Sequence, residues 1–182
     1  GFDIMNNFNV TLSCNHPSVE IMQGTFAYNS MNANDIQMQD NAFTVYFGDD
    51  FTNQQKVKFY LKMENANYTF NDSVMLKVNA PDLRIVALGL TDLDGNKTDR
   101  LMKGQSTLLT FDIENQGGSQ SKEVRNQLHL LAPFISVAET QKAIPAIEAG
   151  ATGQVSFRAD VNDNAIDGII NSNFQTESGH IS

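Results

Sequence analysis

The chain is poor in the residues that build covalent or metal-stapled scaffolds, with one cysteine, four prolines and no tryptophan among 182 residues. A single thiol, Cys14, excludes an intramolecular disulfide and any metal site made from paired cysteines. Cys14 falls in phase with Val10 and Leu12 of an alternating segment, so we expect it to be a small residue of a packed core. The apolar content of 41% is ordinary for a chain with such a core.

Positive charge is also scarce, with 12 Lys and Arg residues against 21 Asp and Glu residues and a formal net charge of −9. This balance excludes a nucleic-acid binder, which needs a basic surface, and a protein that docks on anionic lipid. No apolar run approaches the roughly 20 residues of a membrane-spanning helix. The first residues lack the charged-then-apolar layout of a secretory signal, and we expect the chain to be a piece of a longer one.

Alternation of apolar and polar residues is the dominant pattern. Leu109, Phe111 and Ile113 share one face of a segment whose other face is polar, which is typical of a half-buried β-strand. The other alternating sets are Phe8, Val10 and Leu12; Val19 and Ile21; Phe43, Val45 and Phe47; Val57, Phe59, Leu61 and Met63; and Val74, Leu76 and Val78. The sequence therefore predicts an all-β fold without long helices.

Residues 24–39 fit this pattern least. We expect Phe26, Tyr28 and Met31 to anchor a loop, and Ile36 and Met38 to form a short edge strand. The segment 65–67, Asn-Ala-Asn, is different, because it separates two alternating runs and predicts a tight hairpin turn.

The chain matches itself when it is shifted by about 116 residues, with apolar and proline positions in the same order. This shift places Leu12, Pro17, Val19 and Ile21 on Leu128, Pro133, Ile135 and Val137, and a shift of about 112 places Phe43, Val45 and Phe47 on Val155, Phe157 and Ala159. Two copies of one β-sandwich unit explain both matches. We expect them at residues 1–80 and 81–182, joined at the stiff Pro81. The expected core of the second unit is Leu109, Phe111, Ile113, Leu128, Leu130, Val155 and Phe157.

The two copies are expected to be incomplete in different ways. Gly1 aligns with Gly117, so the first unit lacks a counterpart of Leu83–Gln116, and the second lacks one of Tyr68–Val78. Each unit should then expose an unpaired strand edge, which invites pairing with another chain. We expect an edge-strand dimer of the isolated chain, and flanking sequence in those positions in the intact protein.

Three turns give the second unit a recognisable order. The opening strand is followed by 103–105 (Lys-Gly-Gln), a later strand ends in 115–117 (Asn-Gln-Gly), and 147–150 (Ile-Glu-Ala-Gly) precedes the strand 154–161. This order resembles that of bacterial cell-adhesion-related (CARDB-like) modules, except that the prolines usual in two of the turns are absent. The resemblance implies two tandem immunoglobulin-like β-sandwich units. It also implies an extracellular or outer-surface location, beside the catalytic domain of a secreted gingipain-like or subtilisin-like peptidase of Bacteroides-type bacteria.

No catalytic group is visible in the sequence. His16, His129 and His180 occupy unrelated places in the two copies, and nothing sets a nucleophile and an orienting acid beside any of them. His129 alternates with Leu128 and Leu130, so we expect it to face solvent. We therefore expect no catalytic residues here, and units that are accessory to a catalytic domain elsewhere in the protein.

One loop carries the residues of a cation site. Asp92, Asp94, Asn96 and Asp99 place oxygen ligands at intervals around a glycine turn, which Ca²⁺ favours. The bidentate Glu of an EF-hand loop is missing, because Arg100 follows instead. The alternative interpretation is a hairpin turn in which Asp-Gly supplies the positive φ and the acids are only solvated. Calcium is the one cofactor that the sequence suggests.

Two functions stay open on the sequence alone. The first is a non-catalytic spacer and adhesion module, whose partners are the neighbouring domains and a host or cell-surface protein or glycan. The second is a ligand-binding module for carbohydrate or protein. Tyr46 and Tyr60 lie on the outward phase of their strands, and adjacent on one sheet face they would form a shallow aromatic platform for a sugar.

Overall fold

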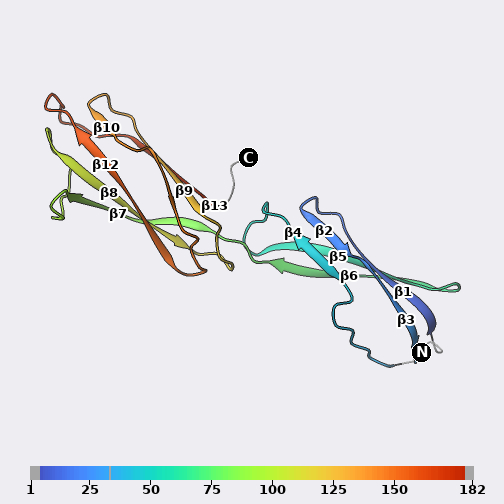
Figure 1. The fold of residues 1–182 in the computed structure, drawn as a ribbon. Helices are drawn as coiled ribbons and strands as arrows, with labels where there is room; N and C mark the ends of the chain where they lie inside the picture. The colour runs from blue at the N-terminus through green and yellow to red at the C-terminus, as the bar shows by residue number, and fades with distance from the viewer. Residues whose placement is uncertain (1–4, 33, 179–182) are drawn as a thin grey trace. The chain divides into compact units, whose positions relative to one another are not determined.

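The structure is a computed structural model that describes residues 5–32 and 34–178 (Figure 1). The regular structure of these residues is all β-strand, paired in antiparallel sheets, and they include no helix that could cross a membrane. The strands are β1 (Met5–Cys14), β2 (Val19–Gln23), β3 (Thr25–Met31), β4 (Thr44–Phe47), β5 (Gln55–Glu64), β6 (Thr69–Val78), β7 (Leu83–Asp92), β8 (Ser106–Asn115), β9 (Val124–Leu130), β10 (Ile135–Val137), β11 (Gln141–Ile144), β12 (Thr152–Val161) and β13 (Ser172–Ser178). The chain divides into unit 1 (Gly1–Val78) and unit 2 (Asn79–Ser182), two residues before the expected boundary.

Unit 2 consists of two sheets with a core between them. Their strand orders are β10-β12-β8-β7 and β11-β9-β13. Phe111 of β8 stacks on Phe174 of β13 with ring centroids 4.0 Å apart, and Phe157 of β12 meets Phe174 edge-on. The buried cluster is Leu109, Phe111, Ile113, Val124, Leu128, Ile147, Val155, Phe157 and Ala159. Six of the seven predicted core residues are thus confirmed as buried, while Leu130 packs against the cluster and is only partly buried.

Unit 1 has one larger and one smaller sheet, in the orders β3-β1-β5-β6 and β2-β4. Phe47 of β4 contacts Phe59 of β5 edge-on at 6.2 Å between centroids, which joins the two sheets. Phe8 is buried on β1 and its ring stacks on Tyr28 of β3 at 5.0 Å. The predicted hairpin turn also forms, because the Asn65 side chain accepts hydrogen bonds from the backbone N–H groups of Asn67 and Tyr68.

Backbone hydrogen bonds repeat between the units at the expected shift of 116. Leu12 N donates to Gly24 O at 2.7 Å in unit 1, and Leu128 N donates to Thr140 O at 2.9 Å in unit 2. The turns before β2 and β10 repeat in the same way, through Val19 N to His16 O and Ile135 N to Ala132 O. The strands β3-β1-β5 therefore correspond to β11-β9-β13, and β2-β4 to β10-β12.

The second expected shift, of 112, is wrong by two residues. Val19 pairs with Phe47 in unit 1 and Ile135 pairs with Val161 in unit 2, so Phe47 corresponds to Val161 rather than Ala159. The true shift here is 114. The misalignment still placed the apolar residues on the correct face of the strand, because side chains alternate with a period of two.

The segment between β2 and β4 also differs from expectation. The residues expected to anchor a loop, Phe26, Tyr28 and Met31, lie in strand β3. Ile36 and Met38 form no strand and are 91% and 90% exposed. At the shift of 114 their counterparts are Gly150, in the turn before β12, and Thr152, the first residue of β12, which is held by β8. The described residues of unit 1 offer no strand in the position of β8.

Candidate functional site

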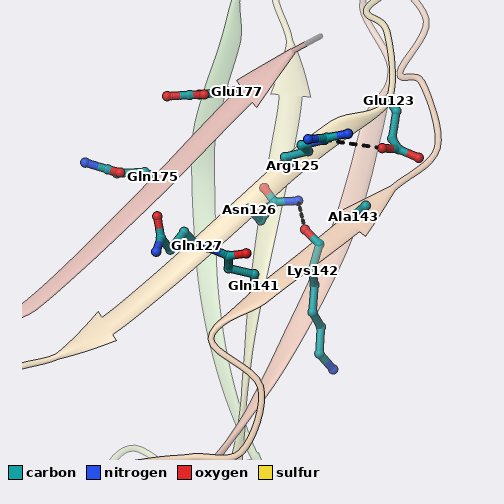
Figure 2. Close-up of a pocket in the computed structure, with 9 residues that line it drawn as sticks. All are labelled: Glu123, Arg125, Asn126, Gln127, Gln141, Lys142, Ala143, Gln175 and Glu177. Carbon is teal, nitrogen blue, oxygen red and sulfur yellow. Dashed lines mark hydrogen bonds and ion pairs between the residues drawn. The ribbon is translucent and has the colours of Figure 1, made fainter. Parts of the chain in front are cut away.

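Unit 2 has a shallow groove of about 320 Å³ on the sheet β11-β9-β13. Figure 2 shows the lining side chains, which come from all three strands and from the segment before β9. They are Glu123, Arg125, Asn126, Gln127, Gln141, Lys142, Ala143, Gln175 and Glu177. We call this surface the amide groove.

A row of three glutamines crosses the amide groove. Gln127 of β9 pairs in register with Gln141 of β11 on one side and with Gln175 of β13 on the other. Residues directly opposite each other in a sheet share a face, so the three side chains lie side by side. An amide both donates and accepts hydrogen bonds. The row therefore presents a line of donors and acceptors.

Charges of both signs flank this row. Arg125 lies in register with Ala143 and Glu177 on the neighbouring strands, and its Nε lies 3.5 Å from Glu123 Oε1. The Lys142 ammonium is not among these charges, because it lies on the inner face of the sheet, 3.3 Å from Glu139 and 5.8 Å from the centre of the Phe157 ring. The groove thus has no dominant charge, which favours a neutral polar ligand over a strongly charged one.

The Asn126 side chain lies behind the amide groove, on the inner face of the sheet that it shares with Val124 and Leu128. The residue is 2% exposed, and its Nδ2 donates to Val124 O and Lys142 O. Its Oδ1 has no hydrogen-bond partner among the described residues, nor does Oγ1 of Thr176, the residue opposite on β13. Both atoms are buried on the inner face of the sheet, so a ligand in the groove does not reach them, and they are a costly unpaired pair inside unit 2.

Sequence reasoning missed the amide groove. The alternation with Leu128 indicates that Gln127 faces outward, but Gln141 and Gln175 come from segments far away in the chain. Only the register of β9 with β11 and β13 brings the three side chains together. One feature of the sequence could have indicated a polar surface here, because the outward-facing positions of β9 are mostly polar residues.

The loop expected to bind calcium is organised by its own hydrogen bonds. Asp92 Oδ1 accepts from the backbone N–H of Asp94 at 3.0 Å and of Asn96 at 2.7 Å, while Oδ2 accepts from Asn96 Nδ2 at 2.9 Å. The Asn96 side chain, followed by these backbone N–H groups, holds the pKa of Asp92 below its ordinary value. Gly95 has a φ of 87°, the left-handed conformation expected of an Asp-Gly turn.

The other expected ligands are not gathered around Asp92. Asp99 forms a bidentate pair with Arg100, which lowers the pKa of Asp99. In the described parts of the chain, no three His, Cys, Asp or Glu side chains lie close enough together to hold a metal ion. The geometry fits the turn interpretation, and calcium binding stays a prediction to be tested.

The two tyrosines do not form the expected platform. Tyr46 lies on β4 and Tyr60 on β5, which belong to different sheets. Phe47 and Phe59 are their immediate neighbours in sequence and meet between the sheets, so the tyrosines point away from each other on opposite outer faces. The expectation that they are adjacent on one sheet face is wrong. Their exposed fractions are 57% and 39%.

The described histidines have structural roles or are exposed. His16 Nδ1 accepts from Ser18 N at 3.2 Å, its Nε2 lies 3.0 Å from Gln55 Nε2, and its ring stacks on Phe51. His129 is exposed, as predicted, and His180 lies outside the described residues. Cys14 is a free, half-buried thiol at the end of β1.

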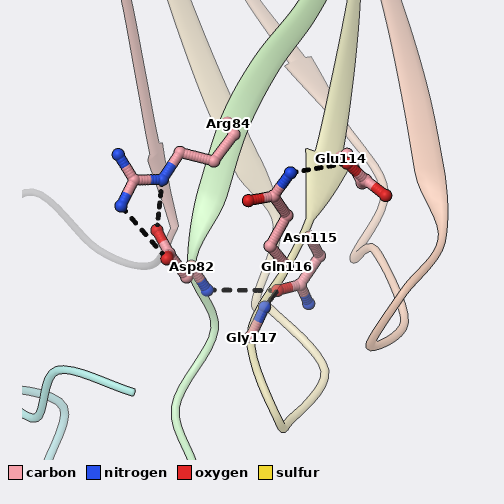
Figure 3. A network of polar contacts seen from close by, with 6 residues as sticks. All are labelled: Asp82, Arg84, Glu114, Asn115, Gln116 and Gly117. Atoms are coloured by element: carbon pink, nitrogen blue, oxygen red, sulfur yellow. Dashed lines mark hydrogen bonds and ion pairs between the residues drawn. The ribbon is translucent and has the colours of Figure 1, made fainter. Parts of the chain in front are cut away.

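The Asn-Gln-Gly-Gly segment after β8 has a structural role (Figure 3). Asn115 is fully buried, and its Oδ1 accepts from Asp82 N at 3.1 Å and Gly117 N at 3.0 Å. Its Nδ2 donates to Ser119 O and Ile147 O at 2.8 and 2.9 Å. One side chain therefore fastens the start of β7, the turn after β8 and the loop before β12.

Gly117 allows the chain to approach this point closely. A Cβ at position 117 would lie 2.2 Å from Ala80 O and 2.4 Å from Asp82 N. Backbone atoms cannot move aside as a flexible side chain does, so only glycine fits. The ion pair of Arg84 with Asp82 closes the outer side of the same contact, with Nε and Oδ1 2.9 Å apart. The motif that carries the family resemblance thus stabilises unit 2.

No family model matches the chain, and a search of curated proteins finds no significant match.

Proposed function

We propose that this chain is a non-catalytic spacer and adhesion module of a larger secreted or cell-surface bacterial protein. The observation that carries the proposal is the repetition of five strands and their turn hydrogen bonds in two units. Serial copies of one β unit lengthen a protein without adding a reaction, and they present side-chain faces for contact. The family resemblance adds the expectation that the units are immunoglobulin-like and that the larger protein is a peptidase.

The segment between the units supports a spacer role. Strand β6 ends at Val78, and the segment from Ala80 to Asp82 is already bonded to unit 2, because Gly118 N donates to Ala80 O and Asp82 N donates to Asn115 Oδ1. The connection contains Pro81, whose φ is fixed by its ring. A long Gly- or Ser-rich tether would behave as a flexible coil, and this connection has neither the length nor the composition for that.

The cellular location and the size of the protein as cells make it test the proposal. Antibodies against the purified chain should detect, in cells that make it, a product much larger than 182 residues that protease added to intact cells removes. A cytoplasmic control protein should survive the same treatment. A product of the size of this chain, or one that is cleaved only after lysis, would overturn the proposal.

A second candidate function is binding of a neutral glycan in the amide groove. The favouring observation is the row of Gln127, Gln141 and Gln175, whose amides match the donor and acceptor pairs of sugar hydroxyls. The volume of about 320 Å³ is at the small end for ligand sites, which suits one or two sugar rings. The lining lacks aromatic residues, so we expect weak binding, with a Kd on the order of 1 mM.

A glycan array followed by NMR titration tests this second function. Gln127→Ala and Gln175→Ala should each abolish the shift changes that a bound glycan causes. Asn173→Ala is the matched control, because Asn173 lies on the same strand face but does not line the groove. Binding lost on Tyr46→Ala and kept in the Gln127 variant would place the ligand elsewhere.

A further inference from the structure

The lysines of the first 78 residues all lie on one pair of strands. The chain has four lysines and no arginine before residue 79, together with eight Asp and Glu residues. The strands that carry the lysines, β5 and β6, pair antiparallel along their whole length (Figure 1). The lysines are Lys56, Lys58, Lys62 and Lys77. The positive charge of an acidic unit is thus gathered in one place.

The register of β5 and β6 places these lysines on the outer face of their sheet. Val57 and Phe59 are buried inward-facing residues of β5, so Lys56 and Lys58 point outward. Lys77 of β6 lies directly opposite Lys56 and shares its face. We call the outer surface formed by Lys56, Lys58, Tyr60 and Lys77 the lysine face.

Two like charges face each other on the lysine face. In an antiparallel pair, the positions that exchange no backbone hydrogen bonds bring their side chains closest together. The bond from Asn65 N to Tyr68 O sets the alternation along β5 and β6, and it makes Lys56 and Lys77 such a position. Like charges directly opposite each other destabilise a sheet.

This repulsion is not relieved by an acid of the same unit. Lys62 has a counter-charge, since its ammonium lies 2.6 Å from Glu64 Oε2. The other three lysines of these strands form no ion pair within the residues that the structure describes. A bound anion between Lys56 and Lys77 would therefore remove a repulsion that persists in the free chain.

An exposed aromatic ring continues the lysine face. Tyr60 occupies the next outward position of β5 after Lys58, and it is 39% exposed. The residues opposite it are small, Ser13 on β1 and Ser73 on β6. The Lys58 ammonium lies 5.1 Å from the centre of the ring. The ring offers a flat apolar surface on which a sugar can pack, with a cation beside it.

We propose that the lysine face binds an acidic polysaccharide, with one sugar ring on Tyr60 and a carboxylate of a following ring between Lys56 and Lys77. Tyr60 and Lys56 are separated by four residues of extended strand, about 14 Å, which a short run of sugar rings spans. This ligand class gives the adhesion role a surface, so the inference rests on the proposed function. The site lies in unit 1, whereas the amide groove lies in unit 2.

Other polyanions match the lysine face less well. A nucleic acid or an anionic membrane is extended, and it would bring its charge against the acidic remainder of a chain whose net charge is −9. An acidic peptide can pair with the lysines but has no rigid ring to pack on Tyr60. A short run of acidic sugars supplies both kinds of contact within the face.

Tetragalacturonic acid and its methyl ester are a matched pair of probes. Both have the same sugar rings, and only the acid carries carboxylates at neutral pH. We expect the acid to bind the full chain in calorimetry at low ionic strength, and more weakly as salt is added, because salt screens exposed charges. The methyl ester, and a hexaglutamate peptide that has charges without rings, should each bind at least about tenfold more weakly.

Variants of the chain locate the site. Lys56→Gln and Lys77→Gln should each weaken binding of the acid about fivefold, and the double variant should abolish it. Tyr60→Ala should weaken binding by a similar factor, whereas Tyr60→Phe keeps the flat ring and should retain most of the binding. Lys103→Gln is the matched control, because it removes the same charge from an exposed position of unit 2. Circular dichroism verifies the fold of each variant.

The stability of the free chain gives a second measurement with the opposite sign. Because the ammonium groups of Lys56 and Lys77 repel each other, Lys77→Gln should raise the melting temperature of unit 1 in the absence of ligand. The same variant should lose the further rise that tetragalacturonic acid causes in the unchanged chain. Lysines that only keep the edge strand β6 soluble would give no ligand-dependent rise in either protein.

The outcomes separate clearly. Binding of tetragalacturonic acid that the double variant abolishes, with weak binding of the methyl ester and of hexaglutamate, supports the proposal. Equal binding of the acid and its ester, binding that the double variant retains, or no binding would overturn it. Hexaglutamate that binds as tightly as the acid would assign the lysine face to an acidic polypeptide, which also overturns the proposed partner. Because the titration uses the purified chain, its failure would leave the spacer role standing, which the protease treatment of intact cells tests separately.

Discussion

Units 1 and 2 share five strands in the same order, but their cores differ in completeness. Of the buried apolar residues described, six lie in unit 1 and twelve in unit 2. In unit 2, β8 and β7 extend the sheet of β10 and β12 to four strands. The corresponding sheet of unit 1 contains only β2 and β4. The difference teaches that alternation makes strands, while the number of strands in the opposite sheet decides how much of each strand is buried.

Strands β4 and β12 illustrate this rule. β12 has ten residues and pairs with both β8 and β10, while β4 has four residues and pairs with β2 alone. Phe157 is fully buried on β12, and its counterpart at the shift of 114, Phe43, is only half-buried before β4. One missing neighbour therefore shortens a strand and exposes its core residue.

The largest expected effect comes from these two phenylalanines. Phe157→Ala should lower the free energy of unfolding of unit 2 by about 3–5 kcal/mol, because it removes a fully buried ring. Phe43→Ala should cost unit 1 about 1–2 kcal/mol, since part of that ring is already in water. Chemical denaturation with hydrogen exchange to assign each transition measures both. Equal losses would mean that the two cores are equally complete.

The next largest loss of stability is expected from replacing Asn115, which has no counterpart in the described part of unit 1. Asn115→Ala leaves two N–H groups and two carbonyl groups of unit 2 without the amide that now pairs with them. We expect unit 2 to lose about 2–3 kcal/mol, because buried unpaired groups are costly. The transition of unit 1 should stay in place in the same denaturation experiment. Gly117→Ala should have a similar effect through its backbone clash.

The sequence predicted the strands and their faces well, because both depend on local alternation. The six buried core residues of unit 2 and the turn at Asn65 followed from period and turn chemistry alone. The prediction from sequence failed where the result depends on which strands lie side by side in the fold. Ile36 and Met38 alternate like a strand but have none to pair with, and Tyr46 and Tyr60 share an outward phase on different sheets. The amide groove needed the register of three distant strands, which no local pattern contains.

A smaller effect should come from pH. Asp160 accepts hydrogen bonds from Ser106 Oγ and Arg158 Nε, and these lower its pKa from the ordinary 3.8. A carboxyl with a lowered folded-state pKa stabilises the protein above its unfolded pKa and loses that contribution as pH falls through the folded one. The melting temperature of unit 2 should therefore fall below pH 3.8, and less so in Asp160→Asn. At the shift of 114 the counterpart of Asp160 in unit 1 is Tyr46, which has no carboxyl group. An identical acid response in the variant would exclude this role.

The smallest expected effect concerns the loop from Asp92 to Asp99. Because Asp92 is already bonded to its own turn, we expect the same melting temperature in millimolar Ca²⁺ and in chelator. Differential scanning calorimetry of the chain and of Asp94→Asn decides this. A rise with Ca²⁺ that Asp94→Asn abolishes would establish a cation site in unit 2.

The contacts of Asn115 also bear on the order of events in folding. Its amide joins groups 33 and 32 residues away in the chain, at Asp82 and Ile147, so those segments must meet before the bonds can form. Closing such loops costs entropy before any contact stabilises them, and the bonds should be absent from the transition state. Loss of Asn115 should then accelerate unfolding and leave the refolding rate nearly unchanged. The residue would act as a latch, which sets the lifetime of the folded unit rather than the speed of its formation.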